Sequence, residues 1–181
     1  GRLIESVLRR TDVAKEAVQN MLCDLLIASH TNRVNIIVCK TALTRHHLIR
    51  DGTNLEEEED VAFPNIVELS GKLAKPSVHL LRAVARIQST LTPEESDMAR
   101  GDVIDGIMVA ADALYEETRT SKAAERRIVI LTDAEHDLVV DEWQSNQLIL
   151  SMLKLNCRME VIGLDFQTSA DFSPSPFDVR S

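Results

Sequence analysis

The chain has 181 residues, of which 44% are hydrophobic and 27% charged, and this size and composition are typical of one globular domain. Its formal net charge of −9 argues against broad binding of nucleic-acid phosphates by this chain itself, because such binding depends on Lys and Arg. No uninterrupted apolar run of about 18 residues predicts a membrane span, and Glu5, Arg9 and Arg10 break any signal-peptide core. We therefore expect an intracellular protein.

The first predicted helix has apolar residues at intervals of three and four, with Thr11 as its N-cap and an end near His30. The next element, from Val34 to Cys39, is short and β-branched with almost no polar alternation. This pattern predicts a central strand that is covered on both faces.

A long exposed loop is predicted from Thr41 to Pro64, because it has no sustained period, contains the turn signal Asp51-Gly52 and carries the acidic run from Glu56 to Asp60. Residues 65–73 can supply a second strand. Ser77 is then the predicted N-cap of a helix that ends before the Thr92-Pro93 break.

In the second half of the chain, predicted helices and strands continue to alternate. An apolar stripe predicts a helix over about 102–118, and the clearest strand follows from Arg127 to Asp133. A further helix is expected over about 139–155, and a strand over 159–164. The predicted inner face of that last helix comprises Val140, Trp143, Gln147, Leu150, Met152 and Leu153.

Strands that alternate with helices across long crossovers predict a doubly wound α/β fold, with a mostly parallel sheet flanked by helices. The domain is expected to span residues 1–166. Residues 167–181, rich in Ser and Pro, resemble a tail or linker.

Candidate chemistry is sparse. The chain lacks GxSxG, a P-loop, HExxH and a glycine-rich dinucleotide turn, so we expect no enzyme and no cofactor. Asp133, at the end of a strand, is either a metal ligand or the cap of the following turn. His46 and His47 are adjacent and are interpreted as surface residues. His30, His79 and His136 lack the spacing of metal ligands.

The three cysteines are far apart and show no CxxC spacing, which predicts buried free thiols rather than a disulfide framework or a zinc site. They are Cys23, Cys39 and Cys157.

Several segments, read in order over about residues 11–166, resemble the N-terminal domain of the large subunit of Ku proteins, which is of von Willebrand factor A-like type. The matching segments are Asp12 to Val18, Asn35 to Val38, Phe63 to Leu69 followed by Leu80-Leu81 and Ile87, Gly101 to Val109, Tyr115 to Thr118 and Arg126 to Asp133. The resemblance implies that the family's first core strand is missing from the chain shown or remodelled.

The wider von Willebrand factor A family carries a metal site built on DxSxS after its first strand. Here the only DxSxS match, from Asp171 to Ser175, lies in the tail and contains a proline, so no metal site is expected. Ku proteins generally share this loss.

The resemblance also implies a function. Ku is a nuclear heterodimer that binds broken DNA ends, recruits factors of non-homologous end joining and acts at telomeres in many lineages. DNA would be bound only through a barrel that this chain lacks, and the partners would be the smaller Ku subunit and short peptide motifs of end-joining factors. Carried across segment by segment, the residues expected to line the peptide-binding groove are Leu48, Phe63 and Met108.

These three residues can equally serve to pack the loop onto the sheet. Other functions also remain open for the same fold, namely a metal-dependent adhesion or receptor domain and a scaffold of proteasomal or transcription complexes.

Overall fold

The structure is a computed structural model. It describes residues 2–28, 31–49, 61–87, 103–121, 124–133 and 142–164, with side chains from residue 10 onward. The acidic run at 56–60, the Thr92-Pro93 break and the tail at 167–181 lie outside the described residues. Within the described part, four helices combine with an antiparallel pair and a parallel pair of strands, which is an α/β architecture. No helix in this part is both long and apolar enough to cross a membrane.

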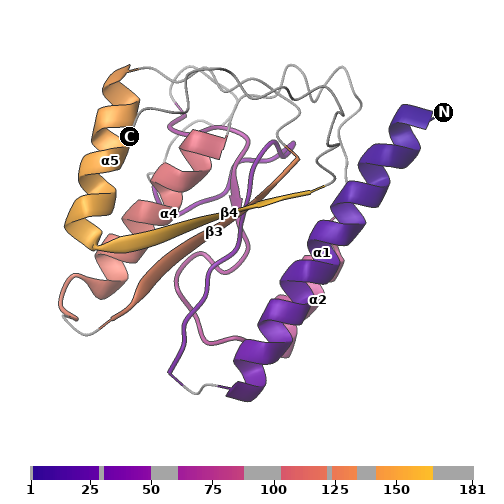
Figure 1. The fold of residues 1–181 in the computed structure, drawn as a ribbon, viewed down its shortest axis with the longest axis horizontal. Helices are drawn as coiled ribbons and strands as arrows, with labels where there is room; N and C mark the ends of the chain where they lie inside the picture. Colours follow the sequence, from indigo (N-terminus) through magenta and orange to yellow (C-terminus); the bar gives the residue numbers. More distant parts are fainter. Residues whose placement is uncertain are drawn as a thin grey trace, which may run out of the picture.

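Helix α1 spans Arg2–Ala28 and lies beside α2, which spans Val78–Ala85 (Figure 1). The predicted N-cap at Thr11 is wrong, because α1 already begins at Arg2. No glycine or proline interrupts residues 2–11, and several of these residues are strong helix formers. The N-cap of α2 is confirmed, since the Leu80 amide donates to Ser77 Oγ over 3.2 Å.

A first hydrophobic core forms between these two helices and the antiparallel strands. Its fully buried members are Leu22, Leu80 and Val84, against which half-buried apolar residues pack from α1, α2 and the strand segments. Burial of one such side chain contributes about 1.5–3 kcal/mol. Alignment of α1 along α2 thus depends on the apolar stripe of each helix.

Strand β1, Ile37–Val38, pairs antiparallel with β2, Val67–Glu68. Hydrogen bonds continue beyond the two short strands, because the Leu69 amide donates to the Ile36 carbonyl and Val34 pairs with Ala74. The prediction of a buried central strand at 34–39 is therefore wrong, since β1 is short and half-buried. Its β-branched composition reflects contact with α1, α2 and α4.

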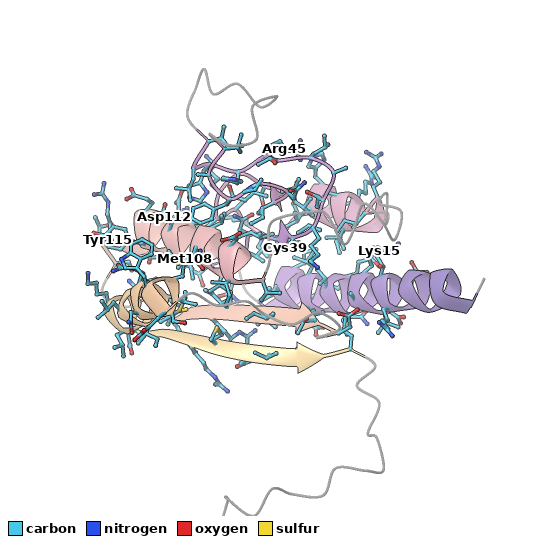
Figure 2. The ribbon with its side chains drawn as sticks, turned by 90° about the horizontal axis from the view of Figure 1, so that it is seen from above. Lys15, Cys39, Arg45, Met108, Asp112 and Tyr115 are labelled. Carbon is cyan, nitrogen blue, oxygen red and sulfur yellow. The ribbon has the colours of Figure 1, made fainter. Side chains whose placement is uncertain are left out.

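Helix α4, Val103–Thr118, confirms the predicted third helix and contacts both β1 and β3. A Cβ at Gly106 would overlap Cys39 Sγ, so any larger residue there would require that thiol to shift. Viewed from above, α4 lies between β3 and the segment that carries Arg45 (Figure 2).

Strand β3, Arg126–Thr132, pairs in parallel with β4, Cys157–Gly163, through the crossover helix α5, Glu142–Leu155. The prediction that parallel strands are joined through a crossover helix is confirmed for β3 and β4. The rest of the predicted sheet is not parallel, because β1 and β2 form a separate antiparallel pair.

A second core joins α4, α5 and β3 through Ile107, Ile128 and Leu148, with Met108 and Met152 packed against it. The predicted inner face of α5 is largely wrong. Trp143, Leu150 and Leu153 are 66%, 48% and 71% exposed, whereas Leu148 and Leu155 are buried. Seven of the fourteen residues of α5 are apolar and they surround the helix, so periodicity could not select one face.

The guanidinium of Arg126, at the start of β3, ties the ends of both covering helices to the sheet. It donates to the carbonyls of Thr118, Ser121 and Leu155 at 2.9, 2.8 and 3.0 Å. The carbonyls near helix C-termini lack partners within the helix, and Arg126 supplies donors to them.

Candidate functional site

The segment 41–49 is anchored to the body of the protein by a buried carboxylate. Glu68 lies in β2, its side chain has 0% exposure, and one of its oxygens accepts from Asn35 Nδ2 over 2.6 Å. The other oxygen accepts from the backbone amide of His47 over 2.7 Å. A charge buried without such donors would be strongly destabilising, so these contacts specify where the segment lies.

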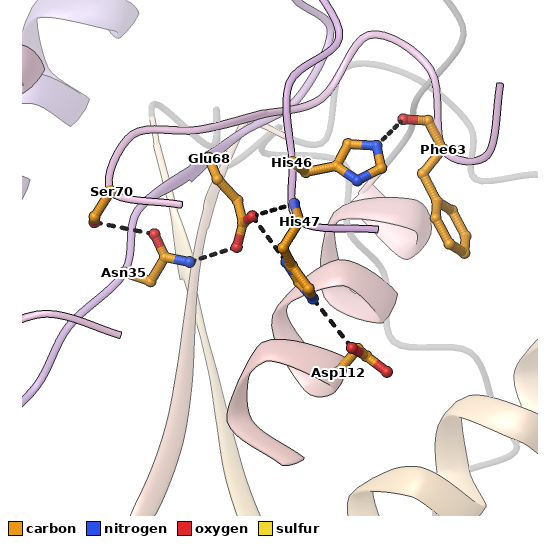
Figure 3. A network of polar contacts seen from close by, with 7 residues as sticks. All are labelled: Asn35, His46, His47, Phe63, Glu68, Ser70 and Asp112. Carbon is orange, nitrogen blue, oxygen red and sulfur yellow. Dashed lines mark hydrogen bonds and ion pairs between the residues drawn. The ribbon is translucent and has the colours of Figure 1, made fainter. Parts of the chain in front are cut away.

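The ring of His47 extends this network to α4 (Figure 3). Its Nδ1 is 2.8 Å from Glu68 Oε2, and its Nε2 is 3.0 Å from Asp112 Oδ2. Both carboxylate oxygens accept hydrogen bonds, whereas a neutral imidazole has only one N–H. The geometry therefore favours an imidazolium. Burial alone lowers the pKa of His47, but the hydrogen bonds and charges of Glu68 and Asp112 outweigh burial and raise that pKa above 6.5.

His46 points its Nε2 to the carbonyl oxygen of Phe63 at 3.0 Å, and the two rings meet edge-on with centroids 6.3 Å apart. Phe63 has a φ of 52°, which is uncommon for a bulky side chain. Asn65 follows with a φ of 59°, and its amide donates to Thr44 Oγ1. The chain at residues 63–65 is thus strained and held by segment 41–49.

The predicted groove residues take three different positions. Phe63 is half-buried against His46, and Leu48 is half-buried directly after His47. Met108 lies on α4 and packs against the core formed by Ile107, Ile128 and Leu148. Phe63 and Leu48 thus belong to one anchored surface region, while Met108 has a packing role as well.

The two adjacent histidines were predicted to be surface residues. That prediction is wrong for His46, which is 6% exposed, and it is confirmed for His47, which is an exposed residue although its side chain is only 23% exposed. Two features of the sequence, neither of which was used for the prediction, could have indicated part of this network. Glu68 is a lone acid in an apolar strand, and Asp112 is a lone acid inside the apolar stretch of α4. Neither signal identified the histidine that joins them, because the pairing spans distant segments.

Asp133 forms an ion pair with Arg10 of α1, with 3.2 Å between Nη1 and Oδ2. Within the described ranges, no group of three or more His, Cys, Asp or Glu side chains could hold a metal ion. The prediction of buried free thiols is correct in that the three cysteines are free, but Cys23 is exposed and the other two are half-buried.

Comparison with protein-family models and with curated proteins finds no match to this chain.

Proposed function

We propose that this chain is a protein-docking domain of a Ku-type large subunit, rather than an enzyme. Its role would be to recruit short peptide motifs of end-joining factors to double-strand breaks in the nucleus, and to act at telomeres. DNA and the smaller subunit would be bound by other parts of the parent protein. The collinear resemblance over residues 11–166 and the α/β architecture support this proposal.

The observation that carries docking is the anchored conformation of Phe63. Its left-handed φ of 52° is maintained by the contact between its carbonyl and the buried His46, and segment 41–49 is in turn anchored by Glu68. Strained residues that the surrounding structure holds in place are concentrated at binding sites. An anchored apolar side chain also loses little entropy when a peptide binds.

A von Willebrand factor A-like fold without a metal site is part of the same proposal. The metal-dependent alternative depends on Asp133 as a ligand. The cation Arg10 contacts that carboxylate at 3.2 Å, which disfavours a divalent ion at the same oxygen. A calorimetric Mg²⁺ titration tests the alternative, since tight binding that Asp133→Ala abolishes would favour it.

The docking proposal is tested by titrating fluorescently labelled peptides from end-joining factors against the chain. Phe63→Ala is expected to weaken binding by about tenfold or more, because truncation of an aromatic anchor typically costs at least about 1–2 kcal/mol. The matched control is Trp143→Ala, which removes a 66% exposed aromatic side chain from α5.

The control should bind as the unchanged chain does. Equal affinities for Phe63→Ala and the unchanged chain would remove Phe63 from the site. Met108→Ala requires a parallel thermal melt, because Met108 also packs against the second core. A DNA-encircling barrel encoded after Ser181 in the parent gene would support the Ku assignment independently.

A further inference from the structure

A concave surface lies beside residues 45–47. It is an open cavity of about 830 Å³ between that segment, the end of β2 and helix α2. Its lining includes the cationic side chains Arg45, Arg82 and Arg86, together with His79. Neither Phe63 nor Leu48 lines it, so it is distinct from the proposed peptide site.

Helix α2 and its C-cap residue Arg86 present most of these groups on one face. His79, Arg82 and Arg86 follow one another at intervals of three and four residues, which places their side chains along the same side of the helix. All three residues are exposed. They are therefore available to a ligand in the cavity.

Arg45 faces them from a fixed backbone. Its amide donates to the Ile66 carbonyl over 2.8 Å, and its carbonyl accepts from the Glu68 amide over 2.8 Å. Because β2 fixes the backbone on both sides of the Arg45 side chain, the cations converge on one space without a large rearrangement.

The charge of this lining is strongly positive for such an acidic chain. The lining contains three guanidinium groups and one carboxylate, that of Glu68. The oxygens of Glu68 already accept hydrogen bonds from Asn35 and His47. None of the ion pairs found in the described part of the chain includes Arg45, Arg82 or Arg86. A cleft with one sign of charge concentrates ligands of the opposite sign.

We propose that this cavity binds a phosphomonoester dianion. Planar guanidinium groups match phosphate oxygens in a bidentate manner, and several cations around one concave space suit a compact dianion. A nucleic-acid backbone fits less well, because the chain carries a net charge of −9.

The test is a calorimetric titration of the 181-residue chain with two probes, inorganic phosphate and blocked phosphoserine (N-acetyl-O-phosphoserine methylamide). Both probes are expected to bind saturably. Arg82→Gln and Arg86→Gln should each weaken binding by about tenfold or more, because charge-assisted hydrogen bonds are lost. Tighter binding of the blocked phosphoserine would support a phosphorylated protein as the ligand. Tighter binding of inorganic phosphate would identify a free anion as the ligand and overturn the phosphomonoester assignment.

The matched control is Arg119→Gln, which removes an exposed arginine near the end of α4, outside the cavity. It should leave both affinities unchanged. Because the docking proposal is tested with peptides and this one with phosphate probes, the two proposals can fail separately. Arg82→Lys should restore part of the lost affinity. Absence of saturable binding to the unchanged chain would overturn the proposal, and so would equal losses in Arg119→Gln and Arg82→Gln. Preferential binding of a single-stranded oligonucleotide would overturn it as well.

Discussion

At the scale of single residues, His47 is the most informative side chain. It joins β2 to α4 by placing one ring nitrogen against each of two carboxylates, and only the protonated ring can donate to both. The stability of this junction should therefore depend on pH.

The predicted dependence follows from the raised pKa of His47. A group whose pKa is higher in the folded state stabilises the fold fully below its ordinary value, here 6.5, and this contribution is lost as the pH rises through the folded value. The difference in unfolding free energy between the unchanged chain and His47→Gln should be about 1–3 kcal/mol in mildly acidic solution and should shrink above neutral pH.

Urea unfolding of both proteins across a pH series measures this difference. The control is His79→Gln, which replaces an exposed histidine on α2. The difference in unfolding free energy between His79→Gln and the unchanged chain should not follow the same pH profile. A His47→Gln effect of constant size at every pH would contradict the charged bridge.

At the scale of elements, local signals predicted two helices well and one incompletely. The Ser77 cap and the apolar stripe of 103–118 depend on neighbours within a few residues, so α2 and α4 were predictable. Helix α5 has apolar side chains all round, and its buried face was decided by contact with α4.

The buried face of α5 can be tested with two leucines of the same helix. Leu148→Ala should lower the unfolding free energy by about 2–5 kcal/mol, because Leu148 fills the second core. Leu153→Ala serves as the matched control, and should change stability by less than about 0.5 kcal/mol, since Leu153 is 71% exposed. Chemical denaturation measures both, and a larger loss for Leu153→Ala than for Leu148→Ala would mean that α5 packs through the face predicted from the sequence.

At the scale of the whole molecule, two cores are built from different elements. The first lies between α1, α2 and the antiparallel strands, and the second between α4, α5 and the parallel strands. The two parts are joined by α4, which contacts both β1 and β3, and by the polar contacts Arg10–Asp133 and His47–Asp112.

This separation predicts additive mutations. Leu80 and Leu148 belong to different cores and share no partner within either cluster. The double variant Leu80→Ala/Leu148→Ala should therefore lose the sum of the two single losses within about 0.5 kcal/mol. Equilibrium unfolding of the three variants gives the coupling energy directly. A coupling above about 1 kcal/mol would show that the cores share a packing contact.

The sequence by itself determined the α/β class, helices α2 and α4 and the strand that begins at Arg126, because caps and periodicities are properties of neighbouring residues. It also placed Phe63 and Leu48 in a segment of interest, through a resemblance. It did not determine the antiparallel pairing of β1 with β2, which depends on hydrogen bonds between segments about thirty residues apart.

Only the tertiary structure decided the chemistry of the site. Glu68, His47 and Asp112 come from three separate segments, and the fold brings them within hydrogen-bond distance. Their charges interact strongly because burial removes much of the surrounding water. Likewise, the arginines of α2 and Arg45 form a basic cavity because β2 and α2 hold them around the same space. Proximity in space, which periodicity cannot encode, converted ordinary surface charges into a candidate binding site.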